Sequence, residues 1–471
     1  MFFKLESTYP NLPEVLHRFV KPMPVHAPRM VIANHQLAQE IGLPASFLSQ
    51  DEAHALLSGS SDQQGVAMAY AGHQFGHFVP SLGDGRAYLL GEVVGPDGVR
   101  RDLHLKGAGR TAYSRGGDGR ATLKAMLREY IISEAMAGLG IPSTRSLAVV
   151  ATGEIVPREL PEPGAVLTRV ARSHVRVGTF QYLAARGEVE AMATLVDYEV
   201  ARNFPGSPQG PTRFLWFFSE AISRQATLIA QWMCVGFIHG VMNTDNMSAC
   251  GETIDYGPCA FIDAFHPQKV FSSIDERGRY AWDKQPTVAL WNLTRLAEAL
   301  LSLFDADRAV AVTLAEEALR KFLPAFESAF EAGMMRKLGS TAPQASDGEF
   351  IAATLMAMTD EQADFTNFFV ALTDQAPLQS FFKDEAVHLA WLEKWRARVP
   401  LPDYAVMRAS NPRYIARNHR VEQALEAARN GDISLVAKLV EIVALPFEKH
   451  DADYTNPPLV DEEVHATFCG T

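Results

Sequence analysis

Residues 239–255, HGVMNTDNMSACGETID, decide how the rest of the chain is interpreted. This polar stretch follows a run of apolar residues from about Phe214 to Phe237, whose spacing predicts a long helix. It concentrates oxygen-bearing side chains, and carboxylate and amide oxygens are the ligands that Mg²⁺ prefers. The stretch therefore predicts a polar loop at the end of a buried helix, in which Asn246 and Asp255 hold a divalent metal.

The order of these polar residues matches the catalytic loop of protein kinases. That loop reads His-Arg-Asp-Leu, three further residues and then Asn, and Asn246 stands seven positions after His239. Asp255 begins an Asp-Tyr-Gly sequence nine residues later, at the position of the kinase Asp-Phe-Gly motif, whose aspartate bridges metal and phosphates. We therefore expect a metal-dependent transfer from a nucleoside triphosphate.

One position of the loop departs from the kinase pattern. Val241 stands where kinases have their catalytic aspartate, and a valine side chain cannot accept a proton. The nearest carboxylate is Asp245, so a general base has to come from Asp245 or from elsewhere in the chain. An ordinary hydroxyl kinase is therefore not favoured.

The elements around the loop follow the order of a two-lobed kinase. Between about residues 68 and 171, short runs separated by glycine turns predict strands: AYLLGEVV, LHLKG, SLAVVATG and AVLTRVA. One helix interrupts them, because residues 121–139 place apolar side chains on a single helical stripe. From about Pro286 to Ala444 the chain reads as successive helices. The predicted fold class is α+β, with a protein-kinase-like bilobal fold.

This organisation predicts four regions. Residues 1–67 contain several prolines and form an N-terminal extension that wraps a domain, and residues 68–180 form a kinase-like N-lobe with the phosphate-binding residues. Residues 181–300 form a kinase-like C-lobe that carries the metal-binding loop. Residues 301–471 form an all-helical C-terminal region that ends in a short tail.

A lysine at the end of a predicted strand is the first candidate for contact with phosphate. Lys106 ends the strand DLHLKG, as the phosphate-pairing lysine of a kinase ends its strand, although a lone strand lysine is usually a solvated surface residue. The predicted helix that follows offers two carboxylate partners. Glu129 flanks its apolar stripe and Glu134 falls within it, and the helical pattern does not choose between them.

Glycines and arginines supply further candidates. Two GDGR sequences, 83–86 and 117–120, place glycines where backbone N–H groups can approach phosphate, although Gly-Asp-Gly is also typical of hairpin turns. The run LTRVARSHVRVG adds three guanidinium groups suited to a triphosphate, or to a solvated strand end: Arg169, Arg172 and Arg176.

Composition limits the class of protein. The formal net charge of −12 gives no overall positive field for a phosphate backbone, so nucleic acid is not an expected partner. We find neither a secretory or transit signal at the start nor an apolar run long enough to span a bilayer, so we expect a cytoplasmic protein without membrane contact.

Two histidines in the string AGHQFGH are a further candidate for metal binding. His73 and His77 have the spacing of metal ligands only within a helix, and Gly76 between them favours a turn instead.

Long strings of this sequence resemble the selenoprotein O family, a kinase-fold family assigned to protein adenylylation. The strings are YAGHQFGHFVPSLGDGRA, HLKGAGRTAYSRGGDGRA, LREYIISEAM, GFIHGVMNTDNMS, ETIDYGPCAF and NPRYIARNHRVEQAL. They extend through much of the chain and are far more specific than the kinase pattern alone.

The resemblance implies that ATP binds in an orientation reversed from that of protein kinases, so that AMP is transferred to Ser, Thr or Tyr hydroxyls of proteins and pyrophosphate leaves. By this likeness Lys106 contacts phosphate and pairs with Glu129, Asp245 accepts the proton, and Asn246 with Asp255 binds Mg²⁺ or Mn²⁺. The family's other nucleotide-contacting positions, which exclude Arg172, correspond to Gly83, Gly85, Arg86, Asp118, Gly119, Arg169 and Arg176, and Asp255 also contacts the nucleotide.

The resemblance also implies a regulatory tail and leaves alternatives. The family forms a redox-sensitive disulfide between its tail and a cysteine after the Asp-Tyr-Gly motif, which corresponds here to Cys469 and Cys259. UMP transfer from UTP with Mn²⁺ is a variant of the same chemistry. The other interpretations are a nucleotide-binding pseudokinase scaffold, indicated by Val241, and a conventional kinase with Asp245 as base.

Overall fold

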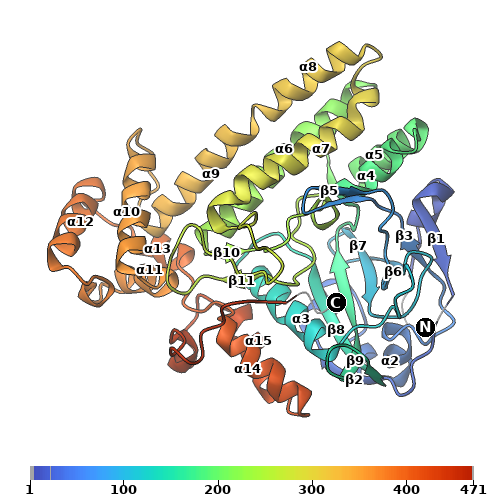
Figure 1. The fold of residues 1–471 in the computed structure, drawn as a ribbon, viewed down its shortest axis with the longest axis horizontal. Coiled ribbons are helices and arrows are strands. Elements are labelled where there is room, and N and C mark those ends of the chain that lie inside the picture. The colour runs from blue at the N-terminus through green and yellow to red at the C-terminus, as the bar shows by residue number, and fades with distance from the viewer. Residues whose placement is uncertain (1–4, 22, 469–471) are drawn as a thin grey trace.

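The computed structural model describes residues 5–21 and 23–468, and its largest sheet is a seven-stranded antiparallel sheet at the right of the view in Figure 1. The strand order is β1-β3-β6-β7-β9-β8-β2. The strands are β1 (His17–Val20), β2 (Arg29–Ala33), β3 (Gly65–Met68), β6 (Ala87–Val94), β7 (Arg100–Lys106), β8 (Arg145–Val156) and β9 (Glu162–Ala171).

The four strands predicted from AYLLGEVV, LHLKG, SLAVVATG and AVLTRVA are confirmed as β6, β7, β8 and β9. Most residues of these strands are buried because elements pack against both faces of the sheet, and residues 147–150 of β8 are fully buried. The predicted helix is confirmed as α3 (Leu123–Gly138), which packs on β8 and β9. Thr122 caps its start by accepting a hydrogen bond from the N–H of Ala125.

The N-terminal segment supplies both edges of this sheet. β1 pairs with β3 at one edge, and β2 pairs with β8 at the other. Two short helices, α1 (His35–Glu40) and α2 (Asp51–Leu57), follow β2 and precede β3. The described part of residues 1–67 is therefore built into the sheet, and its proline-rich sequence did not indicate the two edge strands.

The second half of the chain is helical, as predicted. Two helices, α4 (Val177–Ala184) and α5 (Val189–Asn203), precede the long α6 (Thr212–Cys234). The end predicted for α6, Phe237, is wrong by three residues because Gly236 takes φ +70° and Phe237 enters a two-stranded pair. That pair joins β10 (Phe237–Ile238) to β11 (Ala260–Phe261) across the polar loop.

The helices after residue 284 form two groups (Figure 1). The first group packs on or beyond α6 and contains α7 (Gln285–Phe304), α8 (Arg308–Leu319), α9 (Phe322–Lys337), α10 (Asp347–Glu361), α11 (Phe365–Thr373), α12 (Glu385–Arg398) and α13 (Tyr404–Ser410). The second group, α14 (Asn418–Arg429) and α15 (Ser434–Ala444), returns to pack on α3.

The fold is thus mixed α and β, with one large sheet and many helices. The closer comparison with a two-lobed protein kinase stays a prediction. Across residues 5–21 and 23–468, the helices all lack either the length or the apolar character needed to cross a bilayer. A small hairpin of β4 (Gly72–Gln74) and β5 (His77–Val79) packs against α4 and the Thr244–Asn246 turn, and its own turn at Gly76 confirms the turn predicted there.

Candidate active site

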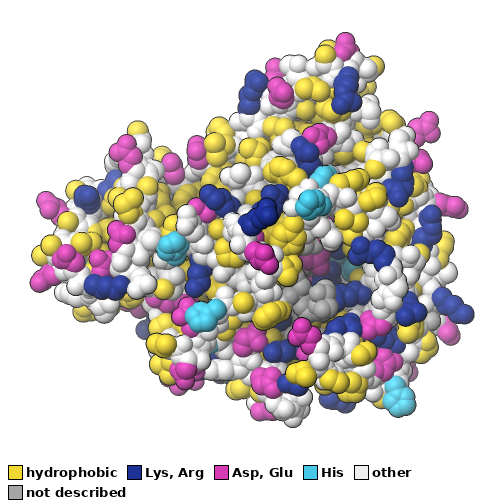
Figure 2. Space-filling view, viewed as in Figure 1, with side chains coloured by type: hydrophobic (Ala, Val, Ile, Leu, Met, Phe, Trp, Pro, Cys, Tyr) yellow, Lys and Arg dark blue, Asp and Glu magenta, His cyan; other side chains and the backbone are white. Residues whose placement is uncertain are grey.

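A cavity of about 590 Å³ lies where the sheet meets the polar loop. Figure 2 shows the surface hollowed near the centre of the drawn face, with Lys and Arg side chains beside the hollow. The cavity brings together eleven of the residues predicted for the site, namely Gly83, Gly85, Arg86, Lys106, Asp118, Gly119, Arg169, Arg176, Asp245, Asn246 and Asp255. These residues come from segments far apart in the sequence, so the fold assembles the site.

Lys106, at the end of β7, contacts two carboxylates. Its Nζ lies 2.7 Å from Oε2 of Glu129 and 3.3 Å from Oδ1 of Asp255. Glu134, the other candidate on α3, instead binds Arg145, with Nη2 and Oε2 2.7 Å apart. Burial, followed by repulsion from Arg169, lowers the pKa of Lys106.

Two arginines reach the same carboxylates from β9 and from the start of α4. Arg169 donates from Nε to Oε1 of Glu129 at 2.5 Å and from Nη2 to Oδ1 of Asp255. Arg176 donates from Nη1 to Oδ2 of Asp255 at 2.5 Å. Arg172 lies elsewhere, where its backbone N–H donates to Glu252. Three cationic side chains therefore converge on one aspartate inside the cavity.

The surroundings of Asp255 keep it ionised. Burial alone would raise the pKa of Asp255, but Arg169, Arg176 and Lys106 hold it well below its usual range. Asp255 also has φ +65°, a left-handed backbone that is uncommon outside glycine and is enriched at functional sites. The cations that compensate this carboxylate are the groups that a polyphosphate would require.

Hydrogen bonds inside the polar loop fix its shape. His239 is fully buried, and its Nε2 lies 2.9 Å from the carbonyl of Ile254, which ties the first part of the loop to Asp255. Burial lowers the pKa of His239, so the ring is neutral near pH 7. Asn246 donates from Nδ2 to the carbonyl of Val241 at 3.1 Å, which leaves its side-chain oxygen for a ligand.

Asp245 is a buried carboxylate in the cavity wall whose surroundings suit a proton acceptor. Its side chain is buried, and burial raises its pKa to about 6, although Arg176 and a hydrogen bond from Gln74 act in the opposite direction. Within the described residues its Oδ1 has no hydrogen-bond partner. Gly72 makes room for this oxygen, because a Cβ there would lie 2.3 Å from Oδ1.

The two GDGR sequences form turns that only glycine fits. Gly83 has φ +62°, and a Cβ there would lie 2.2 Å from the ring of Tyr113. Gly119 has φ +71°, and a Cβ there would lie 2.2 Å from the backbone of Gly109. Asp118, between the second pair of glycines, binds Arg158 at 2.8 Å. These turns expose backbone beside the cavity.

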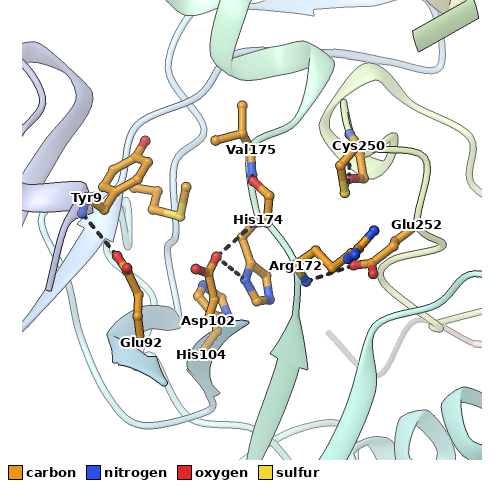
Figure 3. Close-up of polar contacts among 12 residues, drawn as sticks. Tyr9, Glu92, Asp102, His104, Arg172, His174, Val175, Cys250 and Glu252 are labelled. Atoms are coloured by element: carbon orange, nitrogen blue, oxygen red, sulfur yellow. Dashed lines mark hydrogen bonds and ion pairs between the residues drawn. The ribbon is translucent and has the colours of Figure 1, made fainter. Parts of the chain in front are cut away.

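A buried polar network supports the first of these turns, and Figure 3 shows the part of it around Asp102, His104 and His174. Asp84 accepts hydrogen bonds from the N–H of Met68 at 3.0 Å and from Nε2 of His104 at 3.1 Å. The ring of His104 stacks on that of His174, with centroids 4.2 Å apart, and Asp102 lies 3.0 Å from Nδ1 of His174. The network links the turn at residues 83–86, which lines the cavity, to β7 and to the segment that leads to Arg176.

Several residues of the cavity wall were missed from the sequence. They include Tyr70, whose ring lies 4.6 Å from the guanidinium of Arg176, together with Gln74 and Arg158. Gln74 and Tyr70 lie in the quoted string YAGHQFGHFVP, where the spacing of the two histidines drew attention instead. Arg158 follows β8 in a loop without any motif, so no sequence signal indicated it.

Asn246 and Asp255 fit a divalent metal. Both side chains line the same cavity and offer an amide oxygen and an ionised carboxylate, which are ligands that Mg²⁺ and Mn²⁺ accept. In the part of the chain that the structure describes, no three His, Cys, Asp or Glu side chains gather as a metal cluster. Phosphate oxygens or water would therefore have to complete the coordination.

The predicted disulfide falls partly beyond the described residues. Cys259 is buried two residues after the Asp-Tyr-Gly motif, whereas Cys469 lies outside the residues that the structure describes. The tail nevertheless approaches this motif, since Thr467 donates from Oγ1 to the carbonyl of Pro258 at 2.6 Å. The N–H of Thr467 also bonds the carbonyl of Phe271 at 2.7 Å.

Comparisons with known proteins agree on one family. A family model described as "Protein adenylyltransferase SelO" matches residues 2–444. A protein named "Protein nucleotidyltransferase YdiU" from Rhodopseudomonas palustris (strain BisB5) is 50% identical over 488 aligned residues, which cover 100% of this chain and 99% of the relative. A protein of the same name from Bradyrhizobium sp. (strain ORS 278) is 50% identical over 487 aligned residues, with the same coverage.

Proposed function

The chain belongs to the protein adenylyltransferase SelO family and is an enzyme of the nucleotidyltransferase class, and from this premise we propose that it adenylylates proteins. It moves AMP from ATP to Ser, Thr or Tyr hydroxyl groups and releases pyrophosphate. The single observation that carries this proposal is the convergence of Lys106, Arg169 and Arg176 on Asp255, in the cavity that Asp245 also lines.

The cationic residues bind and orient the polyphosphate. Lys106, Arg169 and Arg176 exchange part of their contact with Asp255 for contact with phosphate oxygens, and Arg86 lies in the same wall. The turns at Gly83, Gly85, Asp118 and Gly119 bring backbone close to the nucleotide. Glu129 keeps Lys106 and Arg169 in position through its two carboxylate oxygens.

Asn246 and Asp255 hold the divalent metal, Mg²⁺ or Mn²⁺. When bound, the metal neutralises charge on the phosphates and on the leaving pyrophosphate. Asp255 suits this role because the neighbouring cations hold its pKa well below its usual range, so it is ionised near pH 7. Asn246 contributes the oxygen that its hydrogen bond to Val241 leaves available.

Asp245 accepts the proton of the acceptor hydroxyl. The hydroxyl oxygen forms a bond to the α-phosphorus, the bond from that phosphorus to the β-phosphate bridging oxygen breaks, and pyrophosphate leaves with the electron pair. A carboxylate whose pKa is about 6 is largely ionised near pH 7 yet retains basicity, which is suited to general-base catalysis. In the nucleotide orientation that the family resemblance implies, the acceptor hydroxyl meets the α-phosphate instead of the γ-phosphate. A carboxylate at position 241 would then no longer be placed to accept the proton.

The test identifies which part of the nucleotide is transferred to the acceptor protein. The protein is incubated with candidate acceptor proteins and either α-labelled or γ-labelled ATP, and modified peptides are weighed. Label from the α-position alone, with a mass increase of one AMP, supports the proposal. Label from the γ-position indicates a conventional kinase, and nucleotide binding without any transfer indicates a pseudokinase scaffold. The same assay with UTP and Mn²⁺ tests UMP transfer.

Redox control through the tail is a further part of the proposal. Thr467 holds the tail against Pro258, next to Cys259, which supports a disulfide between Cys259 and Cys469. The two thiols would lose two protons and two electrons to an added oxidant such as peroxide. A non-reducing peptide map after oxidation tests this, and the lack of a cross-linked peptide would contradict it.

A further inference from the structure

We propose that a surface centred on Trp291 receives the acceptor polypeptide and favours segments with Asp or Glu near the hydroxyl residue. This Trp291 patch consists of His73 and Phe78 of the β4–β5 hairpin, Arg279, and Trp291 and Arg295 of α7. The inference rests on the proposed function, because it concerns how the acceptor of that reaction is held.

The hairpin is tied directly to the loop that carries Asp245. The N–H of His73 donates to Oγ1 of Thr244 at 2.7 Å, and the N–H of Phe75 donates to Oδ1 of Asn243 at 2.9 Å. Both acceptors immediately precede Asp245. A polypeptide bound on the hairpin would therefore lie beside the residue that takes the proton.

Ring contacts continue from the cavity wall to the patch. Phe75 lines the cavity, and its ring meets Tyr280 with centroids 5.3 Å apart. The hydroxyl of Tyr280 donates to Asn243 at 2.6 Å, and the neighbouring residue Arg279 places its guanidinium 4.8 Å from the ring of Trp291. The nucleotide cavity and the Trp291 patch thus share one continuous wall.

The patch has the composition of a binding surface. Trp291 packs edge-on against His73 with centroids 5.3 Å apart, and His73 packs against Phe78 at 4.9 Å. A second guanidinium, that of Arg295, lies 5.4 Å from the Trp291 ring. Trp and Arg are enriched among residues that dominate binding energy, and Phe78 leaves 42% of its surface exposed.

The charge of the patch favours an acidic partner. Throughout the described ranges, Arg279 forms no ion pair with a carboxylate, and the partner of Arg295 is Glu298, a half-exposed side chain. Such a surface ion pair contributes little, so it can be exchanged for a carboxylate of the acceptor. The chain as a whole has a net charge of −12, so a cationic surface beside the polar loop is a local exception. It would attract acidic segments and repel basic ones.

The test uses two fluorescent peptides with one serine each, identical except that acidic residues flank the serine in one and lysines in the other. Fluorescence anisotropy measures their binding to the full chain without ATP, and label from α-labelled ATP measures transfer. We expect the acidic peptide to bind about tenfold more tightly, and Arg279→Gln with Arg295→Gln to abolish that preference and raise the peptide KM with kcat little changed.

The control variant is Arg320→Gln, directly after the end of α8, where the arginine side chain is 74% exposed, and it should leave both measurements unchanged. Thermal unfolding checks that the double variant is folded, and Arg279→Lys, which keeps the charge, should retain most of the preference. Equal binding of both peptides, or a preference that survives Arg279→Gln with Arg295→Gln, would overturn the inference. Selective acidic binding without AMP transfer would instead refute the proposed function and leave the patch standing.

Discussion

Arg176 and Asp255 form an ion pair inside the candidate site, with Nη1 and Oδ2 2.5 Å apart. The same nitrogen also donates to the carbonyl of Asp245 at 2.6 Å. One guanidinium therefore connects the proposed metal ligand to the residue proposed to take the proton. A substitution of Arg176 should therefore affect both the proposed metal site and the proposed proton acceptor.

Arg176→Gln should weaken nucleotide binding and lower kcat/KM by about a hundredfold, because it removes one partner of a buried charge pair. Isothermal titration with ATP and a transfer assay measure the two effects. Arg172→Gln is the matched control, since Arg172 lies outside the cavity lining and contacts Glu252 through its backbone. Unchanged ATP affinity in Arg176→Gln would contradict the role given to this arginine.

Asp245→Asn should keep ATP binding within about threefold and reduce the transfer rate by about 10²- to 10⁴-fold, as expected when a general base is removed. The substitution preserves shape, so the contact with Gly72 remains. Single-turnover transfer measures the rate, and titration with ATP measures binding. A variant with near-normal turnover would show that another group accepts the proton.

Stability should depend on pH through His174. Burial and the neighbouring His104 lower its pKa to about 4, below the usual 6.5, so between these values the unfolded chain binds the proton more readily. The stabilisation is present above pH 6.5 and is lost as the pH falls towards 4, by about 3 kcal/mol at most.

Urea unfolding of the wild type and of His174→Asn between pH 4 and 7 isolates this effect, because Asn can still donate to Asp102. We expect the wild type to lose stability relative to the variant as the pH falls. Parallel curves would indicate that His174 keeps an ordinary pKa.

A substitution at Gly138 tests how closely α15 packs on α3. This glycine lies at the end of α3, where a Cβ would come 2.4 Å from the carbonyl oxygen of Val443 on α15. Gly138→Ala should therefore destabilise the protein by about 1–3 kcal/mol, although alanine otherwise favours a helix. Chemical unfolding measures this, and a stabilised variant would contradict the close packing of α15 on α3.

Much of the fold could be predicted because the pattern was local. The strands β6 to β9 are short runs rich in Val, Leu or Tyr and separated by glycine turns, the helix α3 has an apolar stripe, and each was found within a few residues. The edge strands β1 and β2 were not found, because their pairing is with distant strands and their sequence lies among prolines. Local pattern carries no information about such partners.

The residues of the candidate site likewise fall into those that a local motif predicted and those that it did not. Asn246 and Asp255 stand in a motif with fixed spacing, and the structure places both on one cavity. Gln74 and Arg158 have no motif, and their places follow from the packing of the hairpin and of the loop after β8. The partner of Lys106 was undecided by helical position alone, since only the direction of α3 against β7 brings Glu129 within 2.7 Å.

The most direct test of the central claim compares α-labelled with γ-labelled ATP in the wild type and in Asp255→Ala. The account predicts label on acceptor protein from the α-position only, with release of pyrophosphate, and its loss by at least about a hundredfold in Asp255→Ala. Label from the γ-position, or α-label that persists in Asp255→Ala, would contradict it.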